Sequence, residues 1–168
     1  MNTTDMIALL REHIADEQAV GWPNENELVA FLDQAANLVS EKLIADKDYP
    51  LLKRVTASDT PQALPDGFVK FVGNVPVSIV GNEYHGYGEE IDVLCWCKYP
   101  LPSSFERSED FPFDRRISLL IVEIARIMAQ NKNEFDISQD MSLLGAIDTA
   151  ISAARRGRGA NVKAVEQA

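Results

Sequence analysis

Prolines and glycines divide this chain into two ends that can form long helices and a middle that cannot. Seven of the eight prolines and five of the nine glycines lie between residues 50 and 112. Proline lacks a backbone donor and clashes with the preceding helical turn, and glycine weakens a helix, so any helix in this middle block must be short. Helices from opposite ends of the chain must therefore pack together to bury their apolar faces.

The first 50 residues carry two amphipathic patterns. Thr3 or Thr4 is expected to cap a first helix, whose apolar residues fall near one face. A second helix is predicted over residues 25–42. Asn24 and Glu27 form a capping-box pattern at its start, and apolar residues then recur at three- and four-residue steps.

The middle block predicts short strands. Residues 68–72 and 75–80 are apolar stretches separated by a Gly-Asn pair, and residues 90–99 alternate between two faces as a strand does. These strands define a β-rich insertion at about 64–100.

A glycine-rich, flexible loop is predicted at residues 81–88. Its glycines lead into a strand and not into a helix, so they do not fit a phosphate-binding loop. Loops that carry aromatic residues often contact a partner. Tyr84, His85 and Tyr87 are therefore candidate contacts with another subunit or with another protein.

After the last proline the sequence predicts a long helix, with a clean apolar face over residues 117–128. Leu119, Val122 and Ile127 widen that face, so both sides of the helix are expected to be buried, one of them by a neighbouring subunit. Glu123 and Arg126 lie three residues apart and predict an ion pair, either on the surface or within an interface.

A fourth helix is predicted from about residue 136 to residue 154, followed by a flexible basic tail at 157–168. Arg155 and Arg156 lie where positive charge favours the end of a helix. Together with Arg158 they also form a basic cluster that could bind an acidic or grooved surface on another protein.

These patterns predict an α+β protein that is mainly α. We expect an antiparallel bundle of about four helices, with a β-hairpin-rich insertion between the second and third. Residues 1–156 are expected to form one domain, because a chain of 168 residues is long enough for one core.

The formal net charge is −10, and the basic residues at the C-terminus contrast with an acidic body. An acidic surface repels nucleic acid and membrane phosphate, although it is compatible with a passage through which DNA slides. No apolar run approaches the roughly 20 residues that a membrane helix needs, and the first residues lack signal-peptide features. We therefore expect synthesis in the cytoplasm and no membrane partner.

The chain shows no pattern typical of a catalytic site, so no catalytic residue, cofactor or metal is expected, and the protein is not expected to be an enzyme. One alternative is a small metal-assisted enzyme that uses His85 with Glu83, Glu89 or Glu90. A solvated or partner-contacting loop explains the same residues more simply.

Cys95 and Cys97 lie one residue apart on a predicted strand. Two ligands cannot complete a tetrahedral zinc site, and two cysteines on one strand face are poorly placed for a relaxed disulfide. Both are expected to be small buried residues in a reducing compartment.

The chain resembles the head-to-tail connector adaptor proteins of tailed bacteriophages. The resemblance extends over most of the length, and spaced prolines before the long helix are part of it. The other segments that carry it are Asn24-Glu25-Asn26-Glu27-Leu28, Ala35-Ala36-Asn37, Ala63-Leu64-Pro65-Asp66-Gly67, Lys98-Tyr99-Pro100 and Met128-Ala129-Gln130-Asn131.

The resemblance implies a structural protein of the virion neck. Such a protein would form a ring, usually of twelve copies, that binds the portal, extends the DNA channel and provides the platform for tail attachment. The portal contact would lie in residues 145–168, with Arg155, Arg156 and Arg158. A stopper or another tail-completion protein is the alternative within the same neck.

Overall fold

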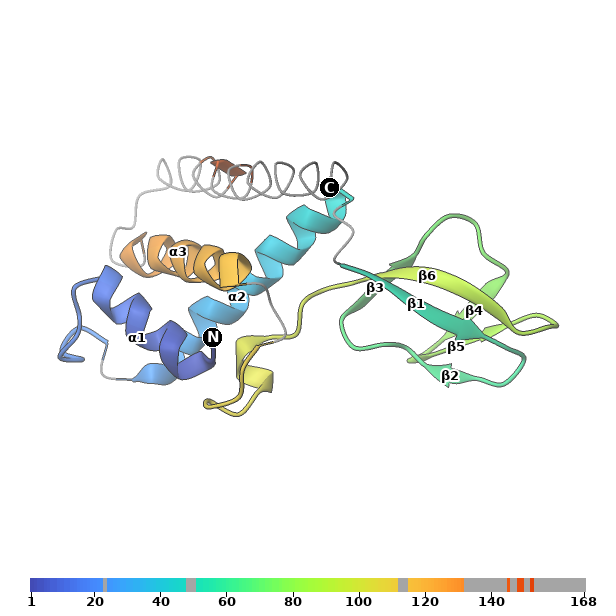
Figure 1. Cartoon of the computed structure of the whole chain (residues 1–168), viewed down its shortest axis with the longest axis horizontal. Coiled ribbons are helices and arrows are strands. Elements are labelled where there is room, and N and C mark those ends of the chain that lie inside the picture. The colour runs from blue at the N-terminus through green and yellow to red at the C-terminus, as the bar shows by residue number, and fades with distance from the viewer. Residues whose placement is uncertain are drawn as a thin grey trace, which may run out of the picture. The chain divides into compact units, whose positions relative to one another are not determined.

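The computed structural model describes residues 1–22, 24–47, 51–111 and 115–131, together with the single positions 145, 148, 149 and 152. These residues form an α+β fold in which helices pack together and two small antiparallel sheets are inserted between α2 and α3 (Figure 1). The helices are α1 (Thr3–His13), α2 (Glu25–Ala45) and α3 (Arg115–Asn131), with a short 3-10 helix, η2 (Pro102–Ser104). The strands are β1 (Leu52–Ala57), β2 (Gln62–Ala63), β3 (Phe68–Phe71), β4 (Val77–Val80), β5 (Glu83–Gly86) and β6 (Ile91–Cys97).

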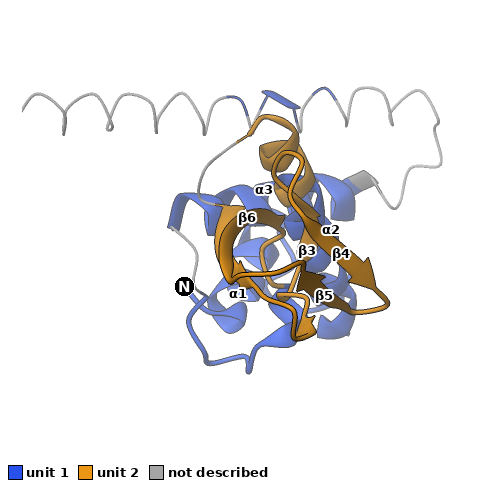
Figure 2. Cartoon of the chain, turned by 90° about the vertical axis from the view of Figure 1, so that its right-hand side faces the viewer, with its two compact units in different colours: residues 1–39, 101–168 blue, residues 40–100 orange. Residues whose placement is uncertain are grey.

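The chain divides into two compact units (Figure 2). Unit 1 combines residues 1–39 with residues 101–168, and unit 2 consists of residues 40–100. The boundary falls within α2. The prediction that residues 1–156 form one domain stays a prediction.

Apolar faces of the helices form the core of unit 1, where α1 packs against α3. The fully buried side chains of this core come from both ends of the sequence: Met6, Leu10, Leu28, Leu32, Val39, Ile117, Ile121, Val122 and Ile124. Burying one such side chain stabilises the fold by about 1.5–3 kcal/mol. The expected packing between N-terminal and C-terminal helices is thereby confirmed for α1 and α3.

Asn2 caps α1, and not a threonine. The Asn2 side chain accepts a hydrogen bond from the Asp5 amide at 2.9 Å, and the Asp5 carboxylate accepts one from the Asn2 amide at 3.3 Å. Thr3 and Thr4 lie inside the helix, where their hydroxyls donate to the carbonyls of Pro102 and Arg107. The two threonines therefore fix the connection before α3 and leave the cap to Asn2.

The start of α2 agrees with the sequence. The Asn24 side chain accepts a hydrogen bond from the Asn26 amide at 3.0 Å, as expected for a residue that caps a helix. Just before it, Trp22 packs edge-on against Phe31 with ring centroids 5.5 Å apart.

The first sheet of unit 2 has the order β1-β6-β3, with β6 in the centre and both pairings antiparallel. Strands β3 and β6 fall where the alternation predicts them. Strand β1 was not predicted, because the insertion was expected to begin at about residue 64. It pairs with β6 along its whole length, from Leu52 opposite Trp96 to Ala57 opposite Ile91.

The second sheet has the order β2-β5-β4 and is also antiparallel. The predicted strand at 75–80 is present as β4. The predicted loop at 81–88 is wrong in part, because residues 83–86 form the central strand β5. Ala57 and Val93 of the first sheet and Tyr84 of the second form a buried hydrophobic cluster in unit 2.

The predicted fourth helix and the basic tail lie almost entirely outside the described residues. The four described positions in that region are helical, and the Thr149 hydroxyl donates to the Gly145 carbonyl at 2.8 Å. Among the helices described, none combines the length and the hydropathy needed to cross a bilayer.

Candidate functional site

The β4–β5 hairpin has one face that carries exposed side chains. Because side chains alternate along a strand, Val80 and His85 lie on the face opposite Tyr84. Val80 is 66% exposed, and Tyr87, just beyond β5, is 67% exposed. The His85 and Tyr87 rings pack edge-to-face with centroids 5.5 Å apart. We call Val80, Glu83, His85 and Tyr87 the hairpin surface.

The backbone that carries Tyr87 is anchored on both sides. The Gly86 amide donates to the Ser58 carbonyl at 2.7 Å, and the Gly88 amide donates to the Asp59 carboxylate at 2.6 Å. Gly88 has φ +95°, a conformation that suits glycine. These hydrogen bonds fix the turn, although the sequence predicts a flexible loop. The backbone at Tyr87 is therefore held in place.

Tyr84 lies on the inner face of the hairpin. Its ring is 3% exposed and packs against Phe71. Its hydroxyl lies 2.9 Å from the Gln62 side-chain oxygen and 3.1 Å from the Thr56 carbonyl, which share its single proton. Burial raises the pKa of this phenol. Of the three aromatic residues proposed from sequence, Tyr84 thus belongs to the core, while His85 and Tyr87 face outward.

The three residues of α3 that were proposed as contacts also differ in their exposure. Val122 is fully buried within the chain, and Ile127 is half-buried. Leu119 is 41% exposed and is the most accessible of the three. A contact of α3 with another subunit would therefore centre on Leu119.

Glu123 and Arg126 form the ion pair that their spacing predicts. Arg126 Nε donates to Glu123 Oε2 at 3.0 Å, and Arg126 Nη2 donates to Glu123 Oε1 at 2.6 Å. These hydrogen bonds lower the pKa of Glu123. His13 on α1 is also near, with Nδ1 4.0 Å from Glu123 Oε2. Both members of the pair are partly exposed, so it is a surface pair of modest strength.

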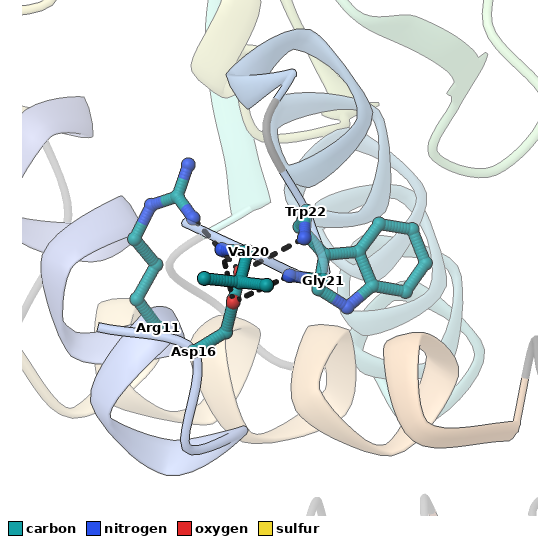
Figure 3. Close-up of polar contacts among 5 residues, drawn as sticks. All are labelled: Arg11, Asp16, Val20, Gly21 and Trp22. Atoms are coloured by element: carbon teal, nitrogen blue, oxygen red, sulfur yellow. Dashed lines mark hydrogen bonds and ion pairs between the residues drawn. The ribbon is translucent and has the colours of Figure 1, made fainter. Parts of the chain in front are cut away.

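The densest polar cluster among the described residues surrounds Asp16, in the loop between α1 and α2 (Figure 3). Its carboxylate accepts hydrogen bonds from the amides of Val20 and Gly21 at 2.8 Å and of Trp22 at 3.0 Å. Arg11 Nη1 donates to it at 3.0 Å, and both charged side chains are about one-tenth exposed.

The amides, with Gly21 first, lower the pKa of Asp16 and keep it ionised. Because four donors occupy its two oxygens, the carboxylate has little capacity left for a substrate or metal. We interpret the cluster as an anchor that fixes the loop leading to α2. No sequence pattern indicates this anchor, because three of its four donors are backbone amides.

The two cysteines are buried free thiols, as predicted, with their sulfur atoms 3.7 Å apart. Burial and the hydrogen bond shared with Cys97 raise the pKa of Cys95 to about 12. A neutral buried thiol is a poor nucleophile and a poor metal ligand, so this pair lacks the features of a reactive site.

Within the described ranges, no three His, Cys, Asp or Glu residues gather closely enough to hold a metal ion. His85, Glu83, Glu89 and Glu90 all belong to these ranges. The alternative of a metal-assisted enzyme therefore gains no support from their arrangement.

A hollow of about 460 Å³ opens on unit 1, and its described lining residues are Met1, Asp5, Leu9 and Arg115. None of these four provides a nucleophile beside a general base. The candidate portal residues Arg155, Arg156 and Arg158 lie outside the described residues.

No family model matches this chain, and no curated protein matches it.

Proposed function

We propose that this protein is a head-to-tail connector adaptor of a tailed bacteriophage. The observation that carries the proposal is that the chain forms two compact units of different structure. Residues from both ends build a helical unit, and the middle of the chain builds a separate β unit with an outward hairpin surface. A ring protein that contacts one neighbour above and another below needs two such surfaces.

In this proposal the helical unit is an antiparallel bundle of about four helices, completed by a fourth helix at about 136–154. Copies of the bundle associate side by side into a ring, with twelve as the expected number, and Leu119 and Ile127 lie near the subunit contacts. The basic cluster of Arg155, Arg156 and Arg158 docks on the portal, and the ring offers a platform to the downstream neck or tail protein.

The charge of the chain supports a lumen through which DNA passes without sequence recognition. A net charge of −10 repels the DNA backbone, so the DNA would slide without binding. The protein would be made in the host cytoplasm and would reside in the neck of the virion. The proposed function requires no catalytic residue and no cofactor.

The decisive experiment is reconstitution with the portal protein that its own phage encodes, followed by electron microscopy. The full chain is expected to form a ring on the portal. A chain truncated after Ala154 is expected to keep its helical content, measured by circular dichroism, but to lose portal binding.

A charge-reversed variant separates the role of the arginines from that of chain length. The triple change Arg155→Glu, Arg156→Glu and Arg158→Glu should abolish portal binding. Arg54→Glu is the matched control, because Arg54 is an exposed arginine of unit 2 and should not affect docking. Tailed, DNA-filled particles assembled with the truncated chain would contradict the tail assignment.

A stopper is the second candidate, and the exposure of Val80 and Tyr87 favours it. A stopper would place the hairpin surface at the contact with its neighbours and would not touch the portal directly. Electron microscopy of the particle distinguishes the two, because only an adaptor lies in the layer against the portal.

A further inference from the structure

Strand β4 has an open edge. In the sheet order β2-β5-β4, it pairs with β5 on one side and with no described strand on the other (Figure 2). An unpaired edge presents backbone donors and acceptors to any extended segment that can align with it.

The turn at the end of β4 defines which backbone groups face that edge. Gly81 has φ +63°, while Asn82 is not in the left-handed region, as in a type II′ hairpin turn. Val80 and Glu83 are then the hydrogen-bonded pair that closes the turn. Because hydrogen-bonded and non-bonded pairs alternate along antiparallel strands, the N–H and C=O of Ile79 point away from β5. Ile79 therefore offers a donor and an acceptor to the open edge.

This edge carries neither the charged side chains nor the in-strand proline that often protect the edges of sheets. Ile79 is 46% exposed and Val80 is 66% exposed. Residues 72–80 contain no charged side chain, and Pro76 precedes the strand instead of interrupting it. Edge strands are commonly guarded by a lysine, a proline or a bulge within the strand, because an exposed apolar edge recruits other strands. An unguarded edge is consistent with one that is used for binding.

The charges beside the edge indicate the chemistry of the partner. Glu83, Glu89 and Glu90 are exposed, and residues 81–90 contain no lysine or arginine. Glu83 pairs with Val80 at the turn end of the hairpin, so its side chain lies on the same face of the sheet as that of Val80. Positive side chains would be favoured there, and a second copy of β4 would bring like charges together.

We propose that the open edge of β4 binds an extended segment of another protein by strand addition, and that this segment alternates apolar side chains with lysine or arginine. Hydrogen bonds to Ile79 would supply the alignment, and the Ile79 side chain would contact the apolar side chains on one face of the sheet. The positive side chains would lie on the opposite face, which carries Val80 and Glu83. Glu83 would select the positive ones. This inference stands apart from the neck assignment, because neither the edge nor its charge depends on the identity of the assembly.

The test uses the full chain and a synthetic probe. The probe alternates valine and lysine over about eight residues, within the usual length of a strand, and a matched peptide has glutamate in place of lysine. Fluorescence anisotropy is expected to show that the lysine peptide binds at least about tenfold more tightly than the glutamate peptide. Hydrogen exchange is expected to show slower exchange of the Ile79 amide in the complex.

Two variants at one position separate the backbone donor from the side chain. Ile79→Pro removes an outward N–H without removing a hydrogen bond to β5, so the sheet should remain folded. It should weaken peptide binding by at least about tenfold. Ile79→Thr is the matched control, because it keeps both the N–H and a β-branched side chain, and its affinity should remain within about threefold of the parent.

Several outcomes would overturn the proposal. These are equal binding of the peptide to Ile79→Pro and the parent, equal binding of the two peptides, or no binding of either. A dimer in sedimentation that Ile79→Pro abolishes would identify a second copy as the occupant. If Ile79→Pro does not fold, a lysine peptide N-methylated at alternate amides takes its place, and undiminished binding of that peptide to the parent overturns the proposal. A protein that fails to bind the portal could still pass every one of these tests.

Discussion

Arg11 and Asp16 form a buried ion pair, with Arg11 Nη1 3.0 Å from Asp16 Oδ2, and the same carboxylate holds three amides of the following loop. Ala15, which precedes Asp16, and Ala19, which lies within this loop, have φ of 56° and 54°, which alanine rarely adopts. The Asp16 interactions must therefore offset backbone strain as well as the burial of two charges.

Replacing Asp16 by asparagine should cause one of the larger losses of stability available to a single substitution in unit 1. It leaves the buried Arg11 charge without its partner, and it puts an amide donor among amide donors. Urea unfolding followed by circular dichroism measures the loss. Glu17→Gln is the matched control, because Glu17 is the exposed neighbouring residue, and it should leave the unfolding midpoint almost unchanged.

Asp16 should also contribute to acid sensitivity. Its pKa is lowered in the folded protein, so its contribution to stability is present above the pKa of unfolded aspartate, about 3.9. That contribution is lost as the pH falls through the lower, folded pKa. Below about pH 4 the parent should lose stability more steeply than Asp16→Asn. Parallel pH curves for the two proteins would contradict the role given to this carboxylate.

Gly67 should be much less tolerant of alanine than Gly73. Both have positive φ, +73° and +76°, so alanine is strained at either position, at a cost of about 1–3 kcal/mol. At Gly67 a Cβ would also lie 2.6 Å from the Lys98 carbonyl oxygen, whereas nothing lies within 4 Å at Gly73. Thermal unfolding should therefore show a clearly larger loss for Gly67→Ala, and equal losses would argue against the close approach.

The parts of the fold that the sequence predicts are those set by local patterns. Helix α2 follows from its cap at Asn24 and its apolar spacing, and β6 follows from the alternation around Val93 and Cys95. The spacing of Glu123 and Arg126 likewise predicts their pair, because three residues along a helix bring two side chains together.

The parts that the sequence misses depend on distant partners. Strand β1 carries Lys53 and Arg54 and lacks clean alternation, and it is a strand because it pairs with β6. Strand β5 ends in glycine and resembles a loop until it is placed between β2 and β4. For the same reason the sequence predicts that Tyr84 is a loop residue, although its ring packs in a core formed with residues of other strands.

Ser118→Ala should be neutral or stabilising, by up to about 1 kcal/mol. The Ser118 hydroxyl is buried and has no hydrogen-bond partner among the described residues, so it carries a desolvation cost that alanine removes. Ser40→Ala is the informative comparison, because the equally buried Ser40 hydroxyl accepts a hydrogen bond from the Tyr99 amide at 3.1 Å. That change should cost about 1 kcal/mol. Chemical denaturation of both variants measures the contrast, and a costly Ser118→Ala would point to a partner for that hydroxyl in the native protein.

Cys95 and Cys97 should not react with a thiol reagent in the native protein. Both are buried, and with a pKa of about 12 only about one Cys95 in ten thousand is ionised at pH 8. Adding a disulfide-exchange chromogen at pH 8 should therefore give no colour until urea unfolds unit 2, when two thiols react. Val80→Cys supplies the positive control, since it places a third thiol at an exposed position and should react at once. Rapid native labelling of the parent would mean that β6 opens readily, which would contradict its place as the central strand of the first sheet.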